Sequence, residues 1–246
     1  MSVSARRPHA PLRVLWIMCH APKEVSASGV LGPHNVNSGY TSFGHDKHIV
    51  VYRKEEAAKV LVHEMVHWWE YDDELFNDRA DHAVSSCLPN CSLKYHIRSA
   101  VTVRPREAVT DTVAILVYTA FHIMDKGTAA AAFAGAYTKA LAVQRRHILY
   151  QASKVLHLQG FRSMKELYNR TFIEESHVFS YYVIKAAMMY DLAKLMPVLK
   201  KRSSDATAAY MGASLADPGF VAAIDHCLVT CSWKGAEFKT MRMSRF

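Results

Sequence analysis

The sequence lacks an uninterrupted apolar run of the roughly 18 residues that a membrane-spanning helix needs, although half of its 246 residues are apolar. We therefore expect no membrane span. The N-terminal stretch also lacks the pattern of a secretion signal. Arg13 interrupts its apolar run from Leu12 to Met18, and no small-residue cleavage site follows. The apolar content is enough for the core of one large domain.

Cysteine is scarce, with five residues. An odd number without an export signal indicates reduced thiols in an intracellular protein, of the cytoplasm or the nucleus. Four of them form two C-x3-C pairs, Cys87 with Cys91 and Cys227 with Cys231. This spacing is looser than that of a zinc knuckle, so we interpret the pairs as free thiols rather than as a second metal site.

A stripe of positive charge interleaved with aromatic residues is missing as well. The formal charge of +8 favours acidic partners in general. Apart from KKR (Lys200 to Arg202) and the tail WKGAEFKTMRMSRF, however, Lys and Arg are scattered, so nucleic-acid binding is an unsupported option. No long polar tract occurs, which excludes wholesale disorder. Nothing in the sequence predicts an oligomeric state.

The apolar pattern predicts an α+β fold in a single domain, residues 1–246. Two β-branched apolar runs of strand length, Arg13 to Cys19 and His48 to Arg53, are separated by a segment rich in Gly, Pro, Asn and Ser. Residues 1–53 are therefore expected to form a small sheet. Residues 54–125 should hold the helices of the candidate site, and residues 126–246 a helical C-terminal part.

Beyond residue 54, apolar residues recur at intervals of three and four, as in helices that bury one face. Pro105 suits the first turn of a helix. The sequence DKGT, from Asp125, is a stop signal, and we expect Pro197 to end the fourth long helix. The predicted helices are Ala57–Trp69, Ala108–Met124, Phe133–Leu156, Val178–Leu199 and Phe220–Val229.

The first of these helices carries the sequence HEMVH, with His63 and His67 four residues apart and Glu64 between them. Four helical residues turn about 400°, so the two imidazoles project within about 40° of each other and about 6 Å apart along the axis. They can bind one ion from a single helical face. Catalytic zinc takes three protein ligands and leaves one position open for water. Glu64 would accept the proton of that water.

Glu107 is the first candidate for the third ligand. It stands four residues before Asp111 on the next predicted helix, which is otherwise apolar, so both carboxylates face the same way. One carboxylate can bind the metal while the other accepts a hydrogen bond from a ligand histidine and fixes its tautomer. We assign these two roles to Glu107 and Asp111, respectively.

Two other residues compete for the third position. Asp73 follows His67 by six residues, as in the metzincin pattern HExxHxxGxx[H/D], but Glu70 stands where that pattern has glycine. His82 follows His67 by fifteen residues. This spacing is similar to that of the SprT/Spartan proteases, which digest DNA-crosslinked proteins, although the glycine-rich surroundings expected near that histidine are missing.

Together, HEMVH and the sequence EAVTD forty residues later resemble the gluzincin metallopeptidases, whose pattern is HExxH plus a downstream ExxxD. The match covers Lys59 to Val117, about a quarter of the chain. It implies a zincin-like fold and zinc-dependent hydrolysis of a protein or peptide substrate. The implied roles are general base for Glu64, hydrogen bonding to a ligand histidine for Asp111, and zinc ligation by His63, His67 and Glu107.

A wider likeness, over most of residues 35 to 190, is to uncharacterised metallopeptidases encoded by large DNA viruses. It is carried by NVNSGYT, IVVYRKEEAAKVLVHEMVHWWEYD, REAVTDTVA and HVFSYYVIKAAM. If the chain is viral, a host-cell or virion location follows. Two alternative functions stay open: a Spartan-like DNA-associated protease with His82 as third ligand, and a non-catalytic virion or partner-binding protein that keeps the scaffold.

Substrate alignment and oxyanion stabilisation need further groups. In gluzincins an edge strand pairs with the backbone of the peptide substrate. His48 to Arg53 leads directly into the HEMVH helix and is either that strand or an ordinary core strand. The sequence ESHVFSYYVIK offers His177, Tyr181 and Tyr182 as donors to a developing oxyanion. We name Tyr182 and His177 as catalytic candidates; the alternative at such spacing is a core role.

Overall fold

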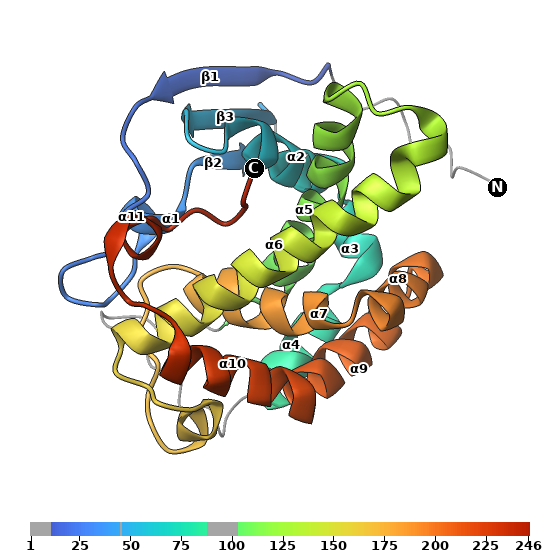
Figure 1. Ribbon diagram of the computed structural model, residues 1–246. Helices are drawn as coiled ribbons and strands as arrows, with labels where there is room; N and C mark the ends of the chain where they lie inside the picture. Colours follow the sequence, from blue (N-terminus) through green and yellow to red (C-terminus); the bar gives the residue numbers. More distant parts are fainter. Residues whose placement is uncertain (1–10, 45, 88–102) are drawn as a thin grey trace.

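The computed structural model describes residues 11–44, 46–87 and 103–246, and the chain has the predicted α+β fold (Figure 1). The N-terminal part forms one small sheet in the order β1-β3-β2. Strand β1 (Val14–Cys19) runs parallel to β3 (His48–Arg53), and β2 (Gly39–Ser42) runs antiparallel to it. The sequence predicted β1 and β3 but not β2, which lies in the Gly- and Ser-containing segment between them.

Strand β3 is the central strand of the sheet, so of the two roles open to it, that of an ordinary core strand holds and that of the edge strand beside the site does not. It has a neighbour on both sides, and its Ile49, Val50 and Val51 are almost fully buried. The edge beside the site is β2. Its Gly39 lies so close to helix α2 (Ala57–Trp68) that a Cβ atom there would be 2.8 Å from Cγ1 of Val60.

The helices predicted from apolar periodicity form the body of the protein. Helix α5 (Pro105–Asp125) packs between α2 and the long helix α6 (Ala130–Leu158), and α10 (Pro218–Thr230) packs along α6 (Figure 1). Helix α5 begins at Pro105 and ends at Asp125, before Gly127 with a φ of +68°. Both the start and the stop signal are therefore confirmed.

The continuous helix predicted for Val178–Leu199 is wrong, because the chain breaks at Asp191. The segment consists of the π-helical turn η2 (Ser180–Ile184), α7 (Lys185–Tyr190) and α8 (Leu192–Lys201). Asp191 has a non-helical backbone, and its carboxylate accepts a hydrogen bond from the backbone N–H of Lys194, which caps α8. Pro197 lies inside α8 and does not end it; its fixed φ suits a helix, and its missing N–H removes a single hydrogen bond.

Several shorter elements were not predicted. Most of their sequences are too short or too polar to show an apolar period, and Ser204–Leu215 is apolar without a helical period. Helix α4 (Asp78–Cys87) packs against α9 (Ser204–Leu215) below α5, and α3 (Tyr71–Leu75) joins α2 to α4 (Figure 1). The unpredicted helices are α1 (Pro33–Val36), α3 (Tyr71–Leu75), α4 (Asp78–Cys87), the 3-10 helix η1 (Met164–Tyr168), α9 (Ser204–Leu215) and α11 (Gly235–Lys239).

The segment after α11 returns to the start of α2, where the backbone N–H of Met243 donates to Glu56, and the last residue, Phe246, stacks on His122 of α5. The segment is anchored by backbone hydrogen bonds to the segment before α1: Met241 donates to Lys23 at 2.8 Å, and Val25 donates to Lys239 at 3.0 Å. Met241 and Met243 are buried. Residues near the two ends of the described chain, such as Lys23 and Met241, are thus in direct contact.

Among the described residues, α5 alone is long and apolar enough to cross a membrane, and 56% of that stretch is buried inside the protein. Packing against its neighbours explains its apolar character. Cys227 and Cys231 are free thiols at the end of α10, and they join no third metal-binding residue among those described. The other pair extends outside the described residues, to Cys91.

Candidate metal centre

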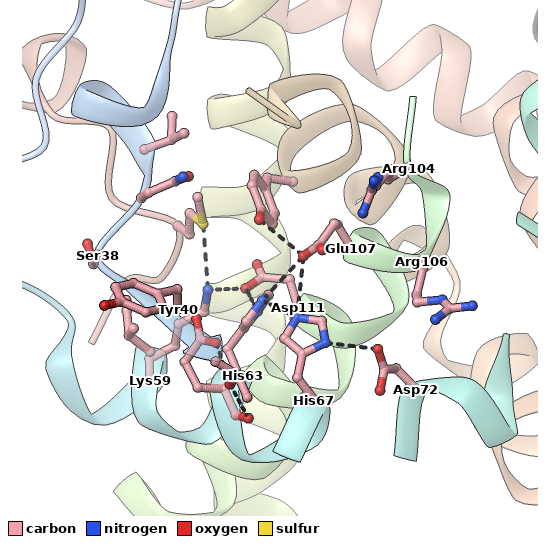
Figure 2. Close-up of a pocket in the computed structure, with 18 of the residues that line it drawn as sticks. Ser38, Tyr40, Lys59, His63, His67, Asp72, Arg104, Arg106, Glu107 and Asp111 are labelled. Carbon is pink, nitrogen blue, oxygen red and sulfur yellow. Dashed lines mark hydrogen bonds and ion pairs between the residues drawn. The ribbon is translucent and has the colours of Figure 1, made fainter. Parts of the chain in front are cut away.

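Helix α2 presents both histidines of HEMVH to a cavity of about 330 Å³ (Figure 2). His63 is buried and His67 is half-buried. Their Nε2 atoms lie 3.2 Å apart. The helix stands between the sheet and α5, so its apolar residues are buried on both sides while the two imidazoles point into the cavity.

Helix α5 brings Glu107 to the same point. Its Oε2 lies 3.4 Å from Nε2 of His63 and 3.5 Å from Nε2 of His67. Of the residues described, these three form the one group of His, Cys, Asp and Glu side chains close enough together to hold a metal ion. A tetrahedral zinc ion with ligand distances of about 2.0 to 2.1 Å places its ligand atoms about 3.3 to 3.4 Å apart. The three separations fit that geometry.

A carboxylate holds the other ring nitrogen of each histidine. Nδ1 of His63 lies 3.0 Å from Oδ1 of Asp111, and Nδ1 of His67 lies 2.8 Å from Oδ2 of Asp72. With the proton of a neutral imidazole on Nδ1, the lone pair on Nε2 faces the centre. Asp111 has the position expected for it. Asp72 was not predicted, because it reaches His67 only after Glu70, with a φ of +54°, has turned the chain back.

Asp111 is itself fixed by two buried ammonium groups. Lys59 donates to its Oδ1, and Lys185 donates to its Oδ2 at 2.6 Å. Burial raises the pKa of Asp111, but Lys185 and Lys59 outweigh burial and hold that pKa well below its usual range. The carboxylate that supports His63 is therefore charged and cannot rotate freely.

Carboxylates surround the two histidines at this end of the cavity. Burial raises the pKa of Glu107, but hydrogen bonds from His63 and His67 hold it well below its usual range. Burial lowers the pKa of His67, but Asp72 and Glu107 outweigh burial and raise it to about 10. These shifts reflect an electrostatic environment that favours positive charge, which a divalent cation would supply in place of the histidine protons.

Glu64 lies beside His63 on α2 and is buried. Its Oε2 accepts a hydrogen bond of 2.9 Å from the hydroxyl of Thr41 on β2. Its other oxygen accepts no hydrogen bond from the described residues. Thr41 was not singled out in the sequence, since one threonine in a Gly- and Ser-containing segment carries no signal. One oxygen of Glu64 is thus held by β2, and the residue lines the cavity.

The tyrosine at the centre is Tyr181, not Tyr182. The hydroxyl of Tyr181 donates to Oε2 of Glu107 at 3.1 Å. Tyr182 points the other way, is buried in the core and donates to the carbonyl of Met241 at 2.6 Å. His177 lies behind Tyr181, with ring centroids 6.3 Å apart, and does not line the cavity. Neither catalytic candidate from the aromatic segment therefore reaches the centre.

The competing third ligands are not brought to the histidine pair. His82 is exposed on α4 and does not line the cavity. Asp73 lies at the rim, where it accepts a hydrogen bond from Arg106. Of the three candidates, only Glu107 has an oxygen at coordination distance from a common point with both imidazoles.

Comparison of the chain with protein-family models, curated protein sequences and solved structures gives no match. The geometry of the residues themselves therefore carries the functional argument.

Proposed function

We propose that this protein is a zinc metallopeptidase whose metal is held by His63, His67 and Glu107. The observation that carries the proposal is the triangle of 3.2, 3.4 and 3.5 Å between the three ligand atoms. Its sides match the edge of a zinc tetrahedron, about 3.3 to 3.4 Å. The chemistry of the donors, two imidazoles and one carboxylate with one face open to a cavity, suits catalytic zinc.

Zinc bound there would supply Lewis acidity, which lowers the pKa of water and polarises a carbonyl group. Three residues of the chain would assist: one transfers the proton, one orients that residue, and one donates a hydrogen bond. Oε1 of Glu64 accepts a proton from the attacking water and passes it to the amine that leaves. Thr41 holds Oε2, and Oε1, which has no partner among the described residues, would face the attacking water. The hydroxyl of Tyr181, which donates to Glu107 in the described structure, would turn to donate to the negative oxygen that develops on the substrate carbon.

Strand β2 is the part of the sheet that suits a peptide. One of its edges pairs with β3, and the other is the free edge of the sheet among the described strands. Gly39, Tyr40 and Thr41 of this strand line the cavity beside the histidines. An extended substrate can add to this edge by backbone hydrogen bonds, which would align one peptide bond with the metal centre.

The alternative of a DNA-associated protease has no support in the site, because it needs His82 as a metal ligand. The alternative of a non-catalytic protein is distinguished from the peptidase by the effect of one substitution. In the peptidase, Glu64→Gln removes the proton acceptor and leaves the three ligands intact. In a non-catalytic protein the same change has no measurable effect.

The test is hydrolysis of a mixed peptide library by zinc-loaded wild-type protein and by Glu64→Gln, with zinc content measured on both. We expect wild-type cleavage to disappear with a chelator and to return with zinc. The variant should keep its zinc while turnover falls by at least about 100-fold. Absence of cleavage by the zinc-loaded wild type, or unchanged cleavage by the variant, would overturn the proposal.

A further inference from the structure

The cavity continues past His63 to an inner end that the metal chemistry does not use. Lys23, Ser38 and Lys59 line this inner end. Figure 2 shows Ser38 and Lys59 on the opposite side of His63 from His67 and Glu107. Ser38 is 3% exposed, and its hydroxyl has no hydrogen-bond partner among the described residues. A buried hydroxyl without a partner needs an explanation, and a bound ligand group is one.

Two buried ammonium groups that line the same cavity as Ser38 also have unused donors. Nζ of Lys23 donates to Glu56 at 2.9 Å, and Nζ of Lys59 donates to Asp111 and to the sulfur of Met243. An ammonium group has three N–H donors. In the described part of the chain Lys23 therefore keeps two donors, and Lys59 keeps one. Buried charged donors without acceptors are costly unless something else binds them.

In the buried ion-pair network behind His63, the basic groups outnumber the acidic ones. Three ammonium groups face two carboxylates, in a network of Lys23, Lys59, Lys185, Glu56 and Asp111. Arg53, also buried, adds to the excess, because its guanidinium donates to the carbonyl oxygens of Pro22 and His34 and not to a carboxylate. One more carboxylate at the inner end would find ammonium donors of this network within the cavity, with the carboxylate of Glu64 as its acidic neighbour.

We propose that the inner end is a subsite for a carboxylate of the substrate, bound by Ser38, Lys23 and Lys59. The proposal rests on the proposed peptidase function and names its substrate class. Lys59 precedes His63 by one helical turn, about 6 Å along the axis. An extended peptide covers that distance in about two residues. The carboxylate is therefore that of an Asp or Glu near the scissile bond, or that of a C-terminus.

Matched peptides separate the two sources of carboxylate. The first has Glu next to the cleaved bond and an amidated C-terminus. The second has Gln in place of Glu, and the third has Gln and a free C-terminus. We expect kcat/KM for the first or the third peptide to exceed that for the second by about tenfold or more, because the charge-assisted hydrogen bonds are lost with Gln. Equal values for all three would overturn the subsite.

Ser38→Ala is the variant that tests the subsite with the least disturbance. It removes a hydroxyl that makes no hydrogen bond within the described protein, whereas a change at Lys59 would also disturb Asp111. We expect the preference for the carboxylate peptide over its Gln partner to fall several-fold. The control is Ser26→Ala, which removes an exposed hydroxyl paired with Ser28 outside the cavity and should leave the preference unchanged.

A binding measurement keeps this proposal separable from the peptidase proposal. Calorimetry of wild type and Ser38→Ala with N-acetylglutamate α-amide, and with its glutamine counterpart, needs no turnover. Binding of the glutamate probe alone, weakened by Ser38→Ala, supports the subsite even if no peptide is cleaved. Peptide cleavage without such binding, and without a preference that Ser38→Ala reduces, overturns the subsite and leaves the peptidase proposal standing.

Discussion

Nδ1 of His67 lies 2.8 Å from Oδ2 of Asp72, a residue only five positions further along the chain. The short connection works because α2 ends at Trp68 and Glu70 adopts a left-handed backbone, so that α3 begins by folding back on the histidine. The side chain of Asp72 is 5% exposed. One tight turn therefore connects the proposed ligand His67 and the carboxylate that orients it.

Asp72→Asn should weaken zinc binding without removing a zinc ligand. The amide keeps the shape of the carboxylate but loses the charge that fixes the imidazole. Loss of such a supporting group lowers metal affinity by about 10- to 100-fold. Competition titration with a chromophoric chelator measures the change. The matched control is Asp73→Asn, one residue on, which contacts Arg106 rather than a histidine and should change zinc affinity by much less.

Asp111→Asn should be the most destabilising of the conservative changes in this region. It leaves Lys59 and Lys185 buried beside a neutral group, and loss of one partner of a buried ion pair costs about 3 to 5 kcal/mol. Chemical denaturation gives the free energy of unfolding. The comparison is Asp46→Asn, which breaks the exposed pair with Arg13 and should cost less than about 1 kcal/mol. Similar losses for the two variants would contradict the buried network.

Zinc affinity should rise with pH between about 7 and 10. In the zinc-free protein Asp72 and Glu107 raise the pKa of His67 to about 10, so zinc must displace a proton there at lower pH. Displacing one proton makes the affinity up to about tenfold higher for each pH unit. The stability of the zinc-free protein should change in the opposite sense. The contribution of protonated His67 is complete below its unfolded pKa, near 6.5, and is lost as pH approaches 10.

Titrations with zinc at pH 7, 8 and 9, with the free energy of unfolding of the zinc-free protein measured at the same values, check both trends. Asp72→Asn is the control, since it removes one of the two carboxylates that hold the proton on His67. Zinc affinity that is independent of pH over this range would contradict the assignment of His67 as a ligand.

The sequence predicted those parts of the site that follow from helical spacing. His63 and His67, and separately Glu107 and Asp111, are four residues apart on apolar helices, so their shared faces could be derived from the period alone. The meeting of the two pairs could not be derived, because it depends on how α2 packs on α5. The resemblance to gluzincins supplied that expectation.

The errors have local causes. Tyr181 and Tyr182 differ by one residue, which is about 100° of helical rotation, and the π-helical turn η2 shifts the helical phase just there. Strand β2 and Thr41 lie in a segment whose Gly and Ser predicted only a connection. The buried lysines Lys23 and Lys185 receive carboxylate partners from other parts of the chain, and no local pattern indicates this. The intracellular location and the single domain stay predictions.

The most direct test of the account is the amount of zinc bound per chain after dialysis against a weak chelator. The wild type and His82→Ala should each retain about one zinc ion, because His82 lies outside the cavity. Glu107→Gln, which replaces the ligand oxygen that lies 3.4 and 3.5 Å from the two imidazole nitrogens, should retain far less. Full retention by Glu107→Gln, or loss of zinc by His82→Ala, would contradict the three-residue centre.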